Sequence, residues 1–256
     1  MIHSTAIIHP KAELESGVEV GPYSIIGEHV KIGKDTKIGP HTTVEGFTEI
    51  GERCEIYQFV SIGTPPQDLK FKGEKSYVII GDDNTMREFV TIHRASSHGG
   101  GETVIGSNNF IMAYSHIAHD CKVGNNVVMA NGTTLGGHIE IQDFVVIGGL
   151  VAIHQFARIG AYSMIGGASA VSQDVPPYVM AVGNRAKLFG LNITGLKRNN
   201  FSTEVIKDLK VAYKTIFRSG MTLKKALEEV KLQPKRSKEV DIFIEFIEKS
   251  ERGICR

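Results

Sequence analysis

Cysteine is scarce in this sequence, with three residues among 256, namely Cys54, Cys121 and Cys255. Their number is odd, and no two of them have the Cys-x-x-Cys spacing. These facts argue against a disulfide framework and against a cysteine zinc site, so we expect three plain thiols. An excess of one charge is missing too. The net charge of +1 excludes a globally basic nucleic-acid binder, although it leaves room for a local basic patch.

Long apolar runs are also missing. No stretch approaches the ~18 consecutive apolar residues that a helix needs to cross a bilayer. The first residues, Met1 to Ser4, do not combine a charged segment with an apolar one. We therefore read no signal peptide and expect a cytoplasmic protein that is not an integral membrane protein.

What the sequence contains instead is an aliphatic residue at every sixth position. The first series is Ile8, Leu14, Val20, Ile26, Ile32, Ile38, Val44, Ile50, Ile56 and Ile62. The period resumes at Ile80, Met86 and Ile92, and then runs unbroken from Ile105 to Val171. A period of six fits neither an α-helix nor a single long strand. It is typical of short strands joined by tight corners and wound as a parallel β-helix, with three hexapeptides in each coil.

Two segments interrupt the period, Thr64 to Ile79 and His93 to Val104, and both are rich in Gly, Pro, Ser or charge. We expect them to leave the coil as loops. Insertions in repeat proteins usually project from one face, and that face is often the binding face. A surface insertion without a role is the alternative.

The energetics of one coil favour self-association. Each coil buries about three aliphatic side chains worth ~1.5 to 3 kcal/mol apiece, whereas ordering its backbone costs ~1 to 2 kcal/mol per residue. Hydrogen bonds between coils, packing of neighbouring coils and burial of an outer face must supply the difference. A homo-oligomer is therefore expected.

The period stops after Pro176-Pro177, where helical patterning begins. The sequence thus predicts a β-helix domain over residues 1–184 and a helical domain over residues 185–256. Ser202 is the expected N-cap of a helix that ends near Gly220, and Thr222 is the expected N-cap of the next helix.

Two further patterns mark the helical region. Val240, Phe243, Ile244 and Ile247 have the i, i+3, i+4, i+7 spacing of another amphipathic helix. A basic strip, which we define as Lys207, Lys210, Lys214 and Arg218, follows one side of the first helix. It is either an ordinary solvated face or a docking surface for an acidic carrier protein.

Histidines gather where the coils stack. Residues eighteen apart lie one above the other, about 4.8 Å apart. His119, Gly137 and Gln155 therefore share a column, with His138 and His154 one position to either side. His116 lies near this group, three residues before His119, and Asp120 follows His119 directly.

Two chemistries suit such a cluster. A histidine of near-neutral pKa can act as a general base on a hydroxyl that attacks an acyl group, and neutral imidazoles can bind zinc. Asp120 could orient the ring of His119, although neighbours on a strand point apart, so that contact requires a corner. The Gly137 N–H could stabilise an oxyanion. No serine or cysteine is visibly placed as a nucleophile.

The segment His116-Ile117-Ala118-His119-Asp120-Cys121 closely resembles the UDP-N-acetylglucosamine O-acyltransferases that begin lipid A synthesis. The likeness covers nearly the whole chain. Its further motifs are Gln67-Asp68-Leu69-Lys70, Thr91-Ile92-His93-Arg94, Gly148-Gly149, His154-Gln155-Phe156, Gln173-Asp174-Val175-Pro176-Pro177-Tyr178 and Gly195-Leu196-Lys197-Arg198.

The resemblance implies a left-handed parallel β-helix of hexapeptide repeats with a C-terminal α-helical domain, assembled as a homotrimer with active sites in clefts between subunits. It implies an acyltransferase that moves a (3R)-hydroxyacyl chain from acyl carrier protein to the 3-hydroxyl of UDP-N-acetylglucosamine. No cofactor or metal is implied for the chain itself, because the donor carries the phosphopantetheine, and no nucleic acid takes part.

The resemblance also assigns roles to residues. His119 is similar to the general base, Asp120 to its partner, and Gly137 to the oxyanion donor. Gly167 corresponds to the position that sets acyl chain length. The implied substrate contacts are Gln67, Asp68, Lys70, His93, His116, His138, His154, Gln155, Asn192 and Arg198.

The chain departs from the family pattern at two positions. Thr194 stands where some members carry a glutamate, and Asn199 where they carry a second arginine beside Arg198. These changes bear on the nucleotide contacts and leave open an acceptor with a 3-amino group.

Three other classes compete with this interpretation. One is a different hexapeptide enzyme, either an N-acyltransferase of the same pathway or a coenzyme A-dependent acetyltransferase; the Gln67–Lys70 loop and the helical tail argue against both. Another is a zinc hydro-lyase of the γ-carbonic anhydrase type, for which His93 and His98 have a suitable spacing. The third is a β-helix scaffold without catalysis.

Overall fold

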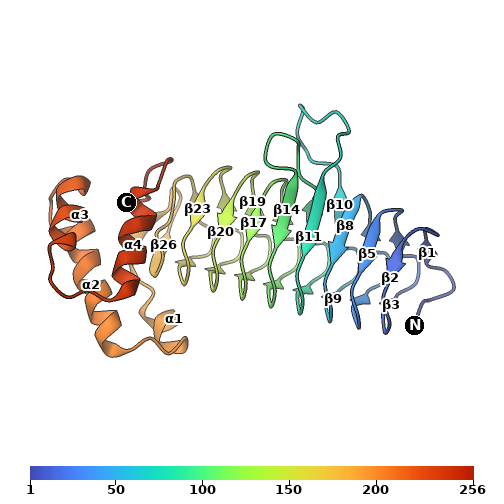
Figure 1. Ribbon diagram of the computed structural model, residues 1–256, viewed down its shortest axis with the longest axis horizontal. Helices are drawn as coiled ribbons and strands as arrows, with labels where there is room; N and C mark the ends of the chain where they lie inside the picture. The colour runs from blue at the N-terminus through green and yellow to red at the C-terminus, as the bar shows by residue number, and fades with distance from the viewer.

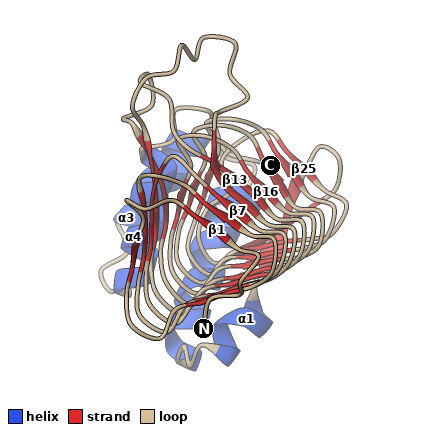
Figure 2. Ribbon diagram, turned by 90° about the vertical axis from the view of Figure 1, so that its right-hand side faces the viewer, coloured by secondary structure: helices blue, strands red, loops and turns tan.

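The computed structural model describes all 256 residues. It is a triangular prism of short parallel strands, with helices packed at its C-terminal end (Figures 1 and 2). Three sheets form the long faces, and each coil contributes one strand to each sheet.

The first sheet contains β1 (Ile7–Ile8), β4 (Ile25–Ile26), β7 (Thr43–Val44), β10 (Ser61–Thr64), β13 (Thr91–His93), β16 (His116–Ile117), β19 (Thr134–Leu135), β22 (Ala152–Ile153) and β25 (Ala170–Val171). The second contains β2 (Glu13–Leu14), β5 (Val30–Ile32), β8 (Phe47–Ile50), β11 (Tyr77–Ile80), β14 (Glu102–Ile105), β17 (Lys122–Val123), β20 (Glu140–Ile141) and β23 (Arg158–Ile159). The third contains β3 (Glu19–Val20), β6 (Lys37–Ile38), β9 (Glu55–Ile56), β12 (Thr85–Met86), β15 (Phe110–Ile111), β18 (Val128–Met129), β21 (Val146–Ile147), β24 (Met164–Ile165), β26 (Val179–Val182) and β27 (Lys187–Leu191).

The register of the strands confirms the coil length that the sequence predicts. Ile117 pairs with Leu135, and Leu135 pairs with Ile153, in steps of eighteen residues. We call the turns from the first to the second sheet the first corner, those from the second to the third sheet the second corner, and those from the third sheet back to the first the third corner.

Both interruptions of the period leave the prism at the first corner. One loop connects β10 to β11 and the other connects β13 to β14, and Figure 1 shows them rising together above the middle of the prism. Two coils are lengthened as a result, because Ile62 pairs with Ile92 and Ile92 with Ile117 across thirty and twenty-five residues. The prediction that the insertions project from one side is confirmed.

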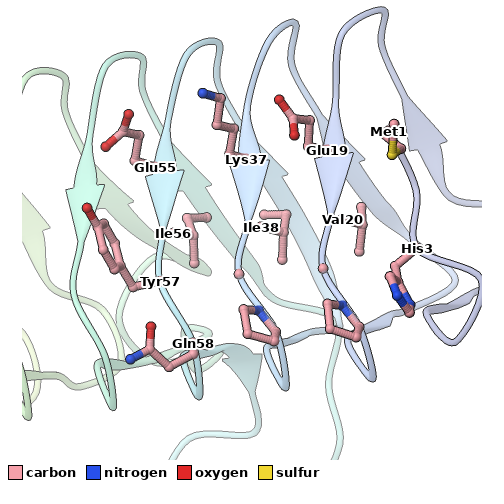
Figure 3. A pocket seen from close by; sticks show the side chains of 14 residues that line it. Met1, His3, Glu19, Val20, Lys37, Ile38, Glu55, Ile56, Tyr57 and Gln58 are labelled. Carbon is pink, nitrogen blue, oxygen red and sulfur yellow. The ribbon is translucent and has the colours of Figure 1, made fainter.

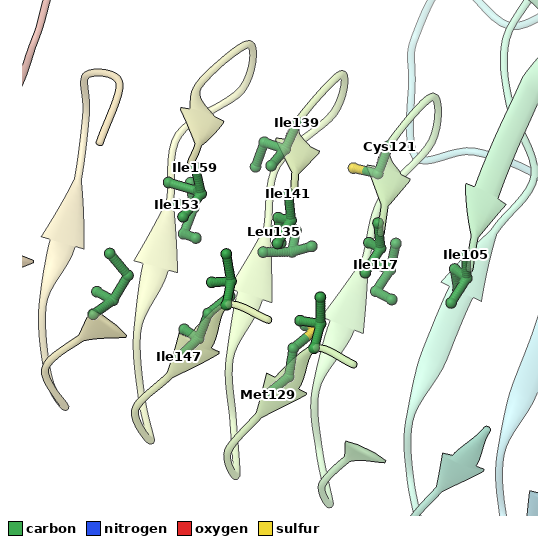
Figure 4. Close-up of a cluster of buried hydrophobic side chains, with 14 of the residues drawn as sticks. Ile105, Ile117, Cys121, Met129, Leu135, Ile139, Ile141, Ile147, Ile153 and Ile159 are labelled. Atoms are coloured by element: carbon green, nitrogen blue, oxygen red, sulfur yellow. The ribbon is translucent and has the colours of Figure 1, made fainter. Parts of the chain in front are cut away.

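The interior of the prism holds the aliphatic residues of the hexapeptide period. Ile117, Leu135 and Ile153 stack along the first sheet, and matching columns from the other sheets meet them in the centre (Figure 4). Small polar residues pack at the corners beside them. The Ser24 hydroxyl donates to Gly39 O at 2.7 Å, and the Thr36 hydroxyl donates to Gly51 O at 2.8 Å, so each ties one coil to the next. Burial of these short side chains is tolerated because their hydroxyls are paired.

Four helices follow the prism, namely α1 (Ile193–Arg198), α2 (Thr203–Arg218), α3 (Leu223–Lys231) and α4 (Lys238–Glu248). The predicted caps are present: Ser202 accepts a hydrogen bond from Val205 N, and Thr222 accepts one from Lys225 N. Gly220 has a left-handed φ of 79° two residues after α2 ends, as a helix stop requires. None of the four helices has the length and apolar character needed to span a bilayer.

The helical region and the prism share one hydrophobic core. Strand β27 pairs antiparallel with β26, and the Cys255 N–H donates a hydrogen bond to Asp174 O. The helices thereby cover the last coil, whereas the first coil, with β1, β2 and β3, has no cover. The domain boundary at 184/185 stays a prediction.

Candidate active site

The first corner between β16 and β17 brings His119 and Asp120 into contact. His119 Nδ1 lies 2.7 Å from Asp120 Oδ2, and Asp120 adopts a left-handed φ of 61°. A straight strand would point these neighbours to opposite sides. The corner that their pairing requires is therefore present.

Asp120 is withdrawn from water while His119 faces outward. The Asp120 side chain has no exposed surface, and the His119 side chain retains 13%. A hydrogen bond to Nδ1 places the imidazole proton on that side and leaves Nε2 as the free acceptor. This is the tautomer that a general base needs.

Gly137 lies against the His119 ring from the next coil. A Cβ at this position would approach His119 Cε1 to 2.6 Å, so only glycine fits beside the ring. The Gly137 N–H has no acceptor within the chain. An unpaired amide next to the base is placed where an oxyanion would need a donor.

His138 completes the group from the other side of the corner. Its ring meets His119 edge-on at 5.1 Å and stacks on Phe156 at 4.5 Å. Burial lowers the pKa of His138, and the charge of His119 adds to this effect, while Asp120 and Asp68 oppose it. His138 is therefore neutral near pH 7.

A second pair of histidines lies on the adjacent strands. His116 Nδ1 is 2.7 Å from the Thr91 hydroxyl, and the His93 ring meets His116 edge-on at 4.8 Å. Burial, together with the charges of His116 and His119, lowers the pKa of His93 to about 4. Burial and the charge of His119 lower the pKa of His116 as well. Both rings are thus uncharged partners for polar groups of a ligand, and His93 Nδ1 is buried without a partner.

The first loop reaches the same corner with Asp68. The negative charge of the Asp68 carboxylate acts on His138 and opposes the lowering of its pKa by burial. Asp68 Oδ1 accepts the Lys70 N–H at 2.9 Å, which shapes the loop tip. Gln67 and Lys70 are exposed there.

His154 and Gln155 lie one coil beyond Gly137 and are both exposed. Arg252, in the C-terminal segment, donates to His154 Nδ1 at 3.1 Å and to Ser172 O at 3.2 Å. The predicted column along the first corner is therefore continuous from His119 to Gln155.

Three predicted site residues lie elsewhere in the chain. Asn192 caps α1 and donates to Tyr162 O at 2.9 Å at the second corner. Arg198 ends the same helix, which Figure 2 shows on the side of the prism opposite the loops. Gly167 lies at the third corner, where a Cβ built on it would lie 3.3 Å from Gly149 O. A single chain therefore does not bring these residues to His119.

The arrangement at the first corner does not have the geometry of a metal centre. His119, Asp120 and His138 offer donor atoms within 4.8 Å of one another. However, the 2.7 Å between His119 Nδ1 and Asp120 Oδ2 is a hydrogen bond. Two donors on a tetrahedral zinc at ~2.0 to 2.1 Å would lie about 3.3 Å apart. His98 is exposed on the second loop and forms no group of donors with His93.

One hollow of the single chain lies away from this corner. A hollow of about 480 Å³ lies on the face formed by β3, β6 and β9, where Glu19 and Lys37 line it together with Met1 and Tyr57 (Figure 3). Its lining carries no histidine paired with a carboxylate. This hollow therefore does not coincide with the cluster around His119.

Comparison with known proteins decides the family. A family model described as UDP N-acetylglucosamine O-acyltransferase, domain 2, matches residues 174–255, and a hexapeptide transferase model matches residues 29–64 and 102–137. An acyl-[acyl-carrier-protein]–UDP-N-acetylglucosamine O-acyltransferase of Thermodesulfovibrio yellowstonii is 60% identical over all of this chain and 99% of its own length. This chain belongs to the UDP-N-acetylglucosamine O-acyltransferase family.

Solved members of the family have the same fold. The UDP-N-acetylglucosamine acyltransferase of Francisella novicida matches with a TM-score of 0.97 at 40% identity, covering all of this chain and 94% of that one. The enzyme of Moraxella catarrhalis matches with a TM-score of 0.96 at 44% identity, covering 99% of its chain. These matches confirm the predicted fold class, a β-helix of hexapeptide repeats with a C-terminal helical region. They also confirm the predicted activity, an acyl-[acyl-carrier-protein]–UDP-N-acetylglucosamine O-acyltransferase that catalyses the first step of lipid A biosynthesis.

Two residues at the first corner have no sequence signal. Ser96 contacts Asp120 from the second loop, and Arg252 reaches His154 from the far end of the chain. The eighteen-residue step does not apply across a loop or into the helical region. That arithmetic does reach two other contacts, because Phe156 lies eighteen residues after His138 and Thr103 lies eighteen residues before Cys121, the neighbour of Asp120.

Proposed function

We propose that His119 is the general base that activates the 3-hydroxyl of UDP-N-acetylglucosamine. Nε2 accepts the hydroxyl proton while the sugar oxygen attacks the thioester carbonyl of a (3R)-hydroxyacyl chain carried by acyl carrier protein. The C–O bond forms and the C–S bond then breaks. The imidazolium returns its proton to the departing thiolate, so no covalent enzyme intermediate is needed.

The observation that carries this proposal is the chain of contacts from Asp120 through His119 to the open edge. The buried carboxylate, 2.7 Å from Nδ1, stabilises the imidazolium that forms during transfer. The unpaired N–H of Gly137 supports a role as donor to the tetrahedral oxyanion. Together these groups supply the base, its orienting partner and the oxyanion donor of direct acyl transfer.

The neutral histidines support recognition of the acceptor sugar. His93, His116 and His138 each have a lowered pKa and offer uncharged donors and acceptors. Gln67, Asp68 and Lys70 on the first loop, and His154 and Gln155 one coil beyond, extend the same surface along the first corner. We propose these eight residues as its contacts with sugar and donor.

We propose that the working unit is a homotrimer, because the remaining site residues lie at other corners. Asn192 and Arg198 belong to the second corner, and Gly167 to the third. Parallel packing of prisms around a threefold axis would bring such edges of one subunit toward the first corner of another. Asn192 and Arg198 would then serve the nucleotide, and Gly167 the end of the acyl chain.

A row of exposed aromatic rings at the third corner favours the same assembly. Tyr23, His41, Phe59, Phe89 and Tyr114 stack one on the next at 4.8 to 5.2 Å. Tyr23 and Tyr114 expose 60% and 64% of their surface in the single chain. An apolar stripe of this length is a natural surface for a second copy.

The basic strip on α2 suits the donor protein. Lys207, Lys210 and Lys214 are exposed, whereas Leu209 and Tyr213 on the opposite side of the helix are buried. We propose that the strip receives the acidic surface of acyl carrier protein. Attraction of this kind weakens as ionic strength rises.

The experiment is a product analysis by mass with purified chain. Carrier proteins bearing 3-hydroxyacyl chains of several lengths are offered with UDP-N-acetylglucosamine or with its 3-amino analogue. We expect an ester of the first sugar that mild base cleaves, and at least about 100-fold slower product formation by His119→Ala. Exclusive formation of a base-resistant amide from the 3-amino sugar would overturn the choice of acceptor, and full activity of His119→Ala would overturn the mechanism.

A further inference from the structure

The second loop closes over the carboxylate of Asp120. Ser96, which is 1% exposed, comes from this loop and donates its hydroxyl to Asp120 Oδ2 at 2.8 Å. The Ser96 N–H also points at the carboxylate, 3.1 Å from Oδ1 and 3.2 Å from Oδ2. One residue therefore supplies two donors to the group that holds His119.

His119 alone does not satisfy the hydrogen-bond acceptors of the Asp120 carboxylate, and the two donors of Ser96 add to it. An ionised carboxylate offers about four acceptor sites, and its burial is costly unless they are used. The His119 ring reaches only Oδ2, and His138 Nε2 lies 3.8 Å from that oxygen. The Ser96 hydroxyl and the His119 ring thus hold the same oxygen from two directions.

The backbone around Ser96 is fitted to this contact. A Cβ on Gly99 would lie 2.1 Å from Asp120 Cγ, so the loop passes directly over the carboxylate and a side chain at position 99 would collide with it. Below it, the Asp120 N–H donates to the Thr103 hydroxyl at 2.8 Å. The loop therefore covers the Asp120 side chain, and Thr103 anchors the Asp120 backbone.

We propose that Ser96 is a positioning residue for acyl transfer. Its hydroxyl and N–H fix the Asp120 carboxylate, which fixes the plane of the His119 ring and directs Nε2 at the acceptor hydroxyl. This inference rests on the proposed role of His119. It also gives the second interruption of the hexapeptide period a role in catalysis, because the loop supplies the cover and the donors of Asp120.

The first test compares three substitutions at this position by steady-state kinetics. Ser96→Ala removes a charge-assisted hydrogen bond, so we expect kcat to fall by about 10- to 100-fold. KM for both substrates should change less than about twofold, because no substrate contact is removed. Ser96→Thr restores the hydroxyl and should recover most of kcat. Ser96→Cys keeps the size but donates weakly, and should fall between the other two.

Ser97→Ala is the matched control. Ser97 is the next residue of the same loop, and its hydroxyl donates to Glu74 Oε1 at 2.9 Å instead of to Asp120. Its kcat should remain within about twofold of the unsubstituted protein. Equal losses in Ser96→Ala and Ser97→Ala would attribute the effect to the loop in general and overturn the positioning role.

A double-mutant cycle separates positioning from mere stability. In an Asp120→Asn background, Ser96→Ala should lower kcat by less than about twofold, because the carboxylate it holds is gone. The same large loss in both backgrounds, or unchanged kcat in Ser96→Ala alone, would overturn the inference. His119→Ala is measured alongside. If His119→Ala keeps full activity the proposed function fails, whereas an inactive His119→Ala beside a fully active Ser96→Ala refutes the role of Ser96 alone.

Discussion

The first and third corners of the prism share a backbone but differ in chemistry. Asp120 and His138 at the first corner have φ values of 61° and 60°, and Leu150 and Ala168 at the third corner have 57° and 55°. The turns are therefore nearly the same shape. One carries an imidazole beside a buried carboxylate, and the other carries apolar residues.

The difference between the two corners lies in the side chains and in the loops. Both long insertions leave the first corner, and one of them encloses Asp120 through Ser96. The third corner is regular throughout and presents a stack of rings from Tyr23 to Tyr114. The coil repeats the geometry, and a local departure from the repeat turns one edge into a site.

The largest test of this comparison replaces a histidine at each corner. His119→Ala removes the proposed base, and general-base catalysis contributes about 10²- to 10⁴-fold. We expect kcat to fall by that amount while the oligomer and its thermal transition are kept. His41→Ala removes one ring of the stack at the third corner and no proposed catalytic group, so the kcat of its assembled oligomer should stay within about twofold. Kinetics give kcat, and size-exclusion chromatography gives the oligomeric state. Comparable losses of kcat in the two variants would contradict the proposed difference between the first and third corners.

The second test adds one methyl group at equivalent places in two turns. Gly137 and Gly149 hold the same position in the first and third corners. A Cβ at 137 would approach the His119 ring to 2.6 Å, whereas at 149 it would approach only Asn131 O at 3.3 Å. Gly137→Ala should lower kcat by about 10²- to 10³-fold through a displaced base and oxyanion donor, and Gly149→Ala by much less. The reverse order of losses would contradict this assignment.

The smallest test concerns stability at acidic pH. The pKa of His93 lies at about 4, below its ordinary value of 6.5, because of burial and the neighbouring histidines. The unfolded chain then binds the proton more readily than the folded one. The stability linked to this group is present above pH 6.5 and is lost as the pH falls toward 4. His93→Gln should therefore show a smaller drop in thermal midpoint from pH 7 to pH 5 than the unsubstituted protein, measured by calorimetry.

A matched substitution again comes from the third corner. His41→Gln should retain the full drop in thermal midpoint, because it leaves His93 and its buried surroundings unchanged. An equal reduction in both variants would place the acid sensitivity in the whole fold instead of in the first corner.

Much of the fold follows from one period in the sequence. Ile117, Leu135 and Ile153 keep the same place in every coil, so stacking arithmetic gives the strands and the column from His119 through Gly137 to Gln155. The caps Ser202 and Thr222 follow from local helix chemistry. These predictions hold because each depends on neighbours at a fixed separation.

The rest of the site depends on separations that have no fixed value. Ser96 lies twenty-four residues before Asp120, across a loop whose path no periodicity describes. Arg252 reaches His154 from ninety-eight residues away after the chain has turned back through the helices. Asn192, Arg198 and Gly167 are assigned to the site by family resemblance alone, because they lie at other corners of the prism and can join His119 only in the proposed trimer.

The unequal ends of the prism have a consequence for how it opens. The helices seal the last coil, whereas Ile8 and Leu14 in the first coil are only partly covered, and full burial begins at Val18 and Val20. In a stacked array each unit is stabilised by its neighbours, so fraying starts where one neighbour is missing. Unfolding that starts at the N-terminal coil must pass through several complete coils before it reaches His119. Amide exchange should accordingly slow step by step from the first coil inward, and the coils that carry His119 and Gly137 should be among the last to open.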